Sequence, residues 1–194
     1  SSSGHSFFFK DEVIRGNLKI KKIGHTSLSS SDGYSEIKEM PSLKGAKIEL
    51  TNNSTQPVFY QDKWVAPHEV VTTVETDESG VAIKDLPFGS YSLKEVLAPT
   101  GYSLNTEWNP TVTLTSEETI EAPELIDERI ALQTMLVDTS GSKTPKYTET
   151  LNLVDHIKYE GLTPGEEYEI TGELYETKQI QEGAAEPIAR GTVR

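Results

Sequence analysis

Hydrophobic and polar residues alternate in short segments along most of the chain, and almost nothing has a helical period. Alternation with a period of two is typical of a strand with one buried face, because successive side chains point to opposite faces. Turns rich in Gly, Pro, Asn and Ser separate a first series of such segments, at 17–23, 46–51, 70–75, 81–84, 90–96, 111–115 and 119–126. Many short strands at this spacing predict a β-sandwich.

A second series of alternating segments starts near Arg129 and comprises 130–137, 148–154, 156–159 and 167–174. We therefore expect an all-β chain of tandem Ig-like β-sandwich domains. The predicted divisions are 1–15, a linker or the end of a preceding domain, then 16–128 and 129–194. Contiguous β-domains with almost no linker favour a rod over a hinged enzyme.

Three ionisable residues fall on the apolar faces of predicted strands. Glu95 has the parity of Tyr91 and Leu93, while Lys22 and Asp127 have the parity of apolar residues that precede them on the first and last strands. A charge that points into an apolar interior is costly unless it is paired. The plain interpretations are a buried ion pair, or a lysine whose ammonium reaches solvent past its apolar stem.

The first domain resembles the Cna B-type domains of Gram-positive surface proteins and pilins. The resemblance covers about residues 16–127. It is carried by G-x-L-x-I-x-K at 16–22, L-K-G-A-K-I-E-L at 43–50, the turn at 77–80 and, most specifically, Y-x-L-x-E-x-x-A-P-x-G-Y at 91–102. It implies a spontaneous isopeptide bond in which Lys22 is the amine, Glu95 the catalytic acid, and an Asp or Asn the acceptor.

No asparagine lies on the last predicted strand, so Asp127 is the expected acceptor. Burial lowers the pKa of a lysine and raises that of a carboxyl group, which would free the amine and keep Glu95 protonated. Folding would hold the partners together at effective molarities of about 10⁵ M or more.

The first strand of the second series places Thr134 on one face with Leu132 and Leu136, and we expect this face to point inward. A threonine among aliphatic residues usually just fills a strand. The region also resembles VaFE-type domains with a Thr–Gln ester bond, through T-x-L-x-D at 134–138 and matching segments at 154–168 and 172–174. This resemblance implies that Thr134 is the ester nucleophile. It also implies that 129–194 is the N-terminal part of such a domain, whose glutamine lies in a missing C-terminal half that could pair with this chain.

Composition excludes several functional classes. The 194 residues carry a net charge of −13, which disfavours nucleic acid because phosphate binding needs a basic surface. No apolar run is long enough to insert into a membrane. The chain has no cysteine, and its four histidines are far apart, so we expect no disulfide, no metal and no cofactor.

Together these features predict a structural stalk segment of an extracellular, cell-wall-anchored adhesin of a Gram-positive bacterium. The anchor signal would lie outside this sequence, and a host surface or matrix ligand would bind other parts of the parent protein. We expect no enzyme activity beyond autocatalytic cross-linking. The alternatives are a pilin subunit, or a ligand-binding adhesin module that uses the aromatic residues of segment 54–68.

Overall fold

The computed structural model describes residues 12–29, 34, 39–144, 150, 152–175, 187 and 189–194. In these residues the regular elements are strands, and no helix is present. The chain divides into two compact units, Ser1–Gly161 and Leu162–Arg194, which are described separately.

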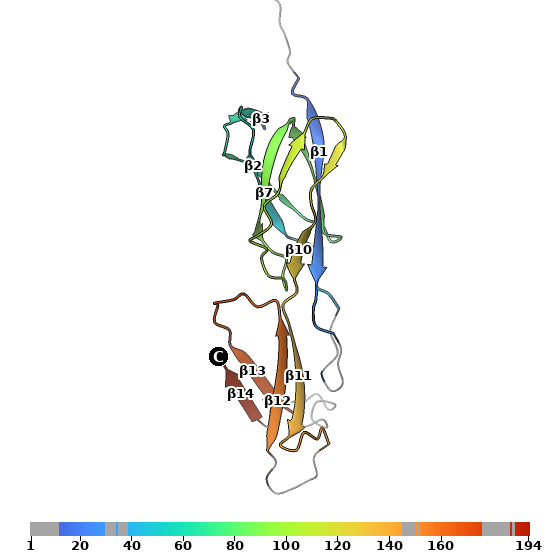
Figure 1. The fold of residues 1–194 in the computed structure, drawn as a ribbon, viewed down its shortest axis with the longest axis vertical. Helices are drawn as coiled ribbons and strands as arrows, with labels where there is room; N and C mark the ends of the chain where they lie inside the picture. Colours follow the sequence, from blue (N-terminus) through green and yellow to red (C-terminus); the bar gives the residue numbers. More distant parts are fainter. Residues whose placement is uncertain are drawn as a thin grey trace, which may run out of the picture. The chain divides into compact units, whose positions relative to one another are not determined.

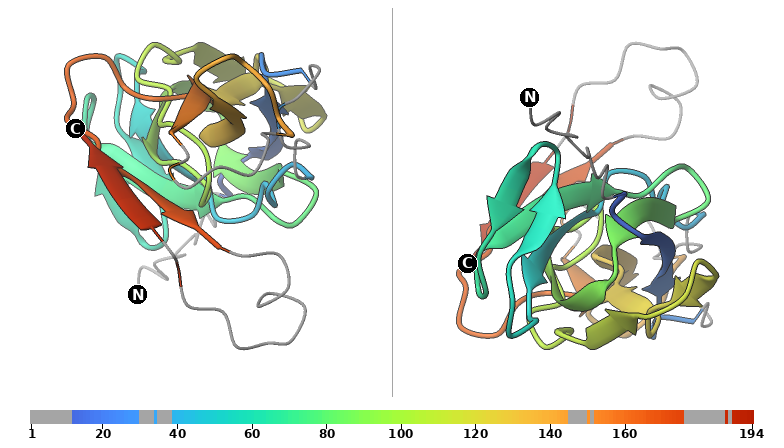
Figure 2. Two further views of the ribbon diagram at one scale, coloured as in Figure 1. Left: turned by 90° about the horizontal axis from the view of Figure 1, so that it is seen from below. Right: turned by 90° about the horizontal axis from the view of Figure 1, so that it is seen from above.

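Two four-stranded sheets pack face to face in the first unit and form the predicted sandwich (Figures 1 and 2). In one sheet a long first strand is flanked on one side by an antiparallel strand and on the other by two short parallel strands. This sheet contains β1 (Arg15–His25), β6 (Val81–Pro87), β9 (Thr119–Glu121) and β10 (Leu125–Glu128). The second sheet is antiparallel, in the order β5 (Val70–Glu75), β2 (Lys47–Asn52), β7 (Gly89–Leu97) and β8 (Thr111–Leu114).

The core lies between these sheets and follows from the alternation in the sequence. On β1, Leu18 and Ile20 are buried, while Lys19 between them is only partly buried. On β7, Tyr91 and Leu93 are completely buried, and the Tyr91 hydroxyl donates a hydrogen bond to Pro87 O. The predicted inward faces of both strands are therefore confirmed.

Two local features differ from the sequence-based expectations. The segment predicted as one strand over 119–126 is divided into β9 and β10 by residues 122–124, which include Pro123, because proline cannot donate a ladder hydrogen bond. The predicted loop 54–68 contains a hairpin of β3 (Val58–Tyr60) and β4 (Lys63–Val65). Its aromatic side chains are not all exposed, since Tyr60 is buried whereas Trp64 is 69% exposed.

A second hairpin in the first unit consists of β11 (Ala131–Asp138) and β12 (Leu153–Glu160), which are antiparallel. The two segments predicted at 148–154 and 156–159 contribute to the single strand β12, although 145–149 and 151 lie outside the described residues. Leu132, Thr134 and Leu136 share a face as predicted, but this face is exposed, and Gln133 and Val137 on the opposite face are buried. The inward orientation of Thr134 was therefore wrong, because the described residues leave its face open to solvent.

Hydrogen bonds join the β11–β12 hairpin to the sandwich. Arg129 N donates to His25 O at 2.8 Å and Ile130 N donates to Gly101 O at 2.8 Å, so backbone pairing continues past the end of β10. Glu160 accepts from Thr26 Oγ1 and from the backbone N–H groups of residues 27 and 28. These bonds place the hairpin in the first compact unit, and the predicted domain boundary at residue 128 stays a prediction.

The second compact unit contains an antiparallel pair, β13 (Ile170–Leu174) and β14 (Ala189–Val193). The first of these was predicted from about residue 167, whereas β14 was not predicted. In the described part of the chain, no helix is both long and apolar enough to cross a membrane.

Candidate functional site: a buried lysine between two carboxyl groups

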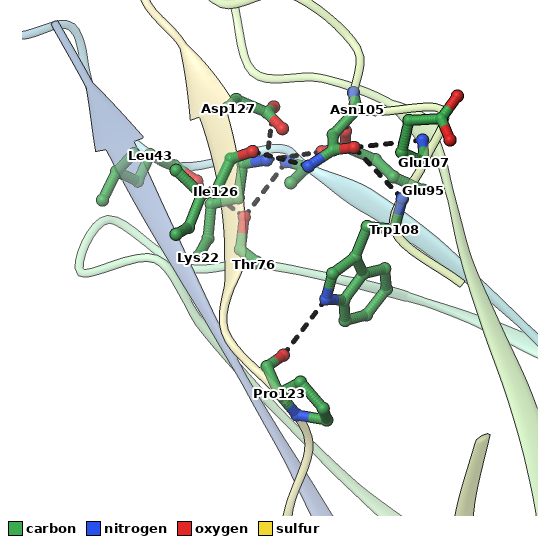
Figure 3. A network of polar contacts seen from close by, with 11 residues as sticks. Lys22, Leu43, Thr76, Glu95, Asn105, Glu107, Trp108, Pro123, Ile126 and Asp127 are labelled. Carbon is green, nitrogen blue, oxygen red and sulfur yellow. Dashed lines mark hydrogen bonds and ion pairs between the residues drawn. The ribbon is translucent and has the colours of Figure 1, made fainter. Parts of the chain in front are cut away.

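Three strands from the two sheets bring Lys22, Glu95 and Asp127 together in the interior of the sandwich (Figure 3). The Lys22 ammonium donates a hydrogen bond of 2.8 Å to Glu95 Oε1 and contacts Asp127 Oδ2. The three residues are 1%, 0% and 1% exposed, respectively. The predicted inward orientation of all three is confirmed, and residues up to 105 positions apart along the chain meet at one point.

Local pairing explains why these side chains converge. Lys22 is the fourth of the alternating buried positions on β1, and its backbone N–H bonds to Gly80 O at 2.7 Å. Glu95 is opposite Ile48 of β2, next to a register shift in that pair of strands. Asp127 is on β10, which pairs in parallel with the end of β1. The site therefore spans both sheets, and no single strand could assemble it.

Burial gives the Asp127 carboxyl group an unusual protonation behaviour. The pKa of Asp127 is raised from 3.8 to about 7, first because burial penalises the ionised form, while Lys22 acts in the opposite direction and the Glu95 carboxyl adds to the rise. The two oxygens of Asp127 accept no hydrogen bond of normal geometry from the described residues.

Glu95 has a different polar environment. Its Oε1 accepts from the Lys22 ammonium, and its Oε2 accepts from the backbone N–H of Asn105 at 2.9 Å. Both donors stabilise an ionised carboxylate. The arrangement is thus a cation between one carboxylate with two donors and one carboxyl group that is easily protonated.

Apolar and aromatic groups exclude water from the site. A Cβ atom on Gly24, which is opposite Asp127 in the strand register, would lie 2.5 Å from the Tyr102 ring. The buried Tyr102 donates from its hydroxyl to Pro41 O at 2.7 Å. Trp108 is also buried, and its Nε1 donates to Pro123 O at 3.2 Å. Glycine at position 24 is therefore required by the close approach of Tyr102.

Sequence reasoning missed Asn105 as a residue of this site. The available signal was an asparagine just after the Pro/Gly turn at 99–101, because asparagine side chains often bond backbone N–H groups two or three residues later. Asn105 Oδ1 accepts from the N–H groups of Glu107 and Trp108, both at 3.1 Å.

Thr134 lies on the exposed face of β11 and is not part of the buried cluster. Its cross-strand neighbour is Ile157 on β12. Its role as an ester nucleophile stays a prediction. Among the described residues, no group of three or more His, Asp or Glu side chains could hold a metal ion.

Two protein-family comparisons match adjoining parts of the chain. Residues 35–124 match the prealbumin-like fold domain called SpaA, and residues 130–194 match the T-Q ester bond containing domain. No curated protein matches the sequence.

Solved structures with similar folds are larger proteins. The TIE protein of Bacillus anthracis is 23% identical over 81% of this chain and 27% of its own, with a TM-score of 0.42. GBS52, the minor pilin of Streptococcus agalactiae, is 22% identical over 70% of this chain and 48% of its own, with a TM-score of 0.39. A streptococcal ancillary pilin is 16% identical over 78% of this chain and 49% of its own, with a TM-score of 0.40. The chain therefore spans between about a quarter and a half of these structures.

The family matches follow the order of the two resemblances noted in the sequence. The chain therefore contains a segment similar to SpaA-type prealbumin-like domains, followed by a segment similar to T-Q ester bond domains.

Proposed function

We propose that the sandwich is a self-cross-linking structural domain, in which Lys22 Nζ and Asp127 Cγ join in an amide bond. The observation that carries this proposal is the burial of one ammonium in contact with two carboxyl groups, one of which has a pKa of about 7. A plain buried ion pair would not need a second carboxyl group, and two buried carboxylates facing one ammonium would leave an uncompensated charge.

The proposed reaction starts with a proton transfer from the Lys22 ammonium to the Glu95 carboxylate across their 2.8 Å hydrogen bond. The free amine attacks Cγ of the protonated Asp127 and forms a tetrahedral intermediate. Glu95 then returns a proton to the departing hydroxyl group, and the amine loses a proton to Glu95. The products are one amide, one water molecule and a protonated Glu95, so atoms and charge balance.

The fold favours amide formation in two ways, by positioning the reacting atoms and by burying them. The fold holds the reacting atoms together before the reaction. In well-oriented intramolecular reactions, such positioning corresponds to an effective molarity of about 10⁵ M or more. The three reacting residues are almost completely buried, so attack of solvent water on the amide is disfavoured. Glu95 acts as a proton shuttle, while Lys22 and Asp127 are used up in a single turnover, and we propose no enzyme activity on other molecules.

At the level of the whole protein, we propose that this chain is a stalk segment of an extracellular adhesin or pilin of a Gram-positive bacterium. The support is the pairing of a SpaA-type domain with a T-Q ester bond domain, together with the lack of cysteine. An amide between β1 and β10 would link the first and last strands of the sandwich without a disulfide. Cell-wall anchoring and contact with a host ligand would belong to other parts of the parent protein.

Two substitutions of the acceptor test the proposal. Asp127→Asn should still cross-link, because a carboxamide can lose ammonia where the carboxyl group loses water. Its product is the same molecule as the wild-type product, so both should have the same intact mass. Asp127→Ala should keep its unmodified mass. A mass of Asp127→Ala that is still one water lighter would place the acceptor at another residue.

The proposed reaction should slow as the pH rises through about 7. The pKa of Asp127 is raised, so the group is a reactive carboxylic acid below about 7 and a poorly electrophilic carboxylate above it. Freshly synthesised chain can be exchanged into buffers well below and well above this pH, quenched in denaturant at intervals and weighed. A rate that increases steadily across this range would contradict the assignment of the proton to Asp127.

A further inference from the structure

One residue outside the three reacting groups bonds both to the proposed proton shuttle and to the strand that carries the acceptor. Asn105 donates its backbone N–H to Glu95 Oε2 at 2.9 Å, and it donates its side-chain Nδ2 to Ile126 O at 2.7 Å (Figure 3). Ile126 directly precedes the acceptor Asp127 on β10. The acid and the acceptor strand are therefore held by the same residue.

The third set of contacts fixes the conformation of Asn105 itself. Its Oδ1 accepts from the N–H groups of Glu107 and Trp108, both at 3.1 Å, which closes a tight turn in the loop between β7 and β8. Trp108 is buried and bonds to Pro123 O, just before β10. The loop thus holds the strand from two positions, through Asn105 at Ile126 and through Trp108 at Pro123.

The strand that carries the acceptor needs such support. Strand β10 is four residues long, and its ladder to β1 covers only the pairs from Lys22–Leu125 to His25–Glu128. A short strand on one neighbour is held weakly, whereas the reacting atoms must stay within a fraction of an ångström of the productive geometry.

We propose that Asn105 is the positioning residue of the cross-linking reaction, and that it couples docking of β10 to orientation of Glu95. This inference rests on the proposed function. The backbone N–H turns Glu95 so that Oε1 faces Lys22, and the carboxamide holds the β10 backbone so that Asp127 faces the same amine. The reaction then proceeds only after the loop between β7 and β8 has closed on the last strand.

Two substitutions separate the contacts of the carboxamide. Asn105→Ala removes both the turn contacts of Oδ1 and the bond to Ile126. Asn105→Asp keeps an oxygen that can accept from residues 107 and 108, but its ionised form has no hydrogen to donate to Ile126 O. Asn109, an exposed residue of the same loop, provides the control Asn109→Ala.

The test measures the rate of cross-linking in full-length chain made by cell-free synthesis with a brief label, then quenched in denaturant at intervals and weighed. Folding of each variant is followed separately by circular dichroism and protease resistance. We expect Asn105→Ala and Asn105→Asp to fold and to react about tenfold to a hundredfold more slowly than wild type, whereas Asn109→Ala reacts normally. The rate of Asn105→Asp, relative to wild type at the same pH, should recover in acid, where a protonated aspartate can donate to Ile126 O.

The outcomes distinguish this inference from the function on which it depends. If wild type loses water while Asn105→Asp folds and reacts at the wild-type rate at neutral pH, the positioning role is overturned and the proposed function stands. If Asn105→Asp is slow by the same factor at every pH, the bond to Ile126 is not the cause and the inference is also overturned. If wild type loses no water, the proposed function fails, and this inference fails with it.

Discussion

Glu95→Gln is expected to leave the sandwich folded and to slow amide formation by about a hundredfold to ten-thousandfold, the usual contribution of a positioned acid or base. Glutamine keeps the shape of the side chain and can still accept the 2.9 Å bond from the Asn105 N–H. It cannot accept a proton from the Lys22 ammonium, so the amine stays protonated and unreactive. Intact mass after overnight incubation should show the unmodified chain as the main species.

A matched control is Glu121→Gln, which alters another glutamate that bonds a lysine of β1. The Lys19–Glu121 pair has an N–O distance of 2.7 Å, but Glu121 lies on the solvent side of the sheet. Glu121→Gln should cross-link at the wild-type rate. If Glu95→Gln did so as well, Glu95 would be a structural partner of Lys22 and another group would have to move the protons.

Removal of the amine should produce the largest loss of stability. Lys22→Met keeps an apolar stem in the core but cannot form the amide. A cross-link that closes a loop of about 100 residues is worth roughly 4.7 kcal/mol on the chain-entropy account. Loss of this amount should lower the melting temperature of the sandwich by roughly 20 °C or more. Two buried carboxyl groups without their cation add to the loss.

The control for this change is Lys19→Met, on the same strand and three positions before Lys22. Its exposed ion pair with Glu121 should contribute less than about 1 kcal/mol. Calorimetry on both lysine variants and on Glu95→Gln separates the loss of the amide from the loss of the buried cation. Glu95→Gln retains the lysine but lacks the amide. Equal melting temperatures for wild type and Glu95→Gln would mean that no cross-link stabilises the sandwich.

Parity was sufficient to predict the buried cluster from the sequence. Lys22, Glu95 and Asp127 each continue a run of alternating buried positions, and a strand gives a side chain only two directions to point. The sequence could not show that the backbone N–H of Asn105 bonds to Glu95, because the loop conformation that makes this bond is not encoded by alternation.

In the second half of the chain, alternation was not sufficient to predict which face of a strand is buried. The sequence identified the shared face of Leu132, Thr134 and Leu136 correctly, but alternation does not indicate which of two faces is covered. In the described residues Gln133 is buried instead, at 2% exposure, and its carboxamide has no hydrogen-bond partner among them. The hairpin β3–β4 was missed because three-residue strands are too short to show a period.

The central claim is the Lys22–Asp127 amide, and the most direct test is the mass of the purified wild-type chain in denaturant, followed by digestion and tandem mass spectrometry. The account predicts an intact mass one water below that of the sequence, and a branched peptide that joins the segment containing Lys22 to the segment containing Asp127. A chain with the full unmodified mass, in which both segments are recovered as separate peptides, would contradict it.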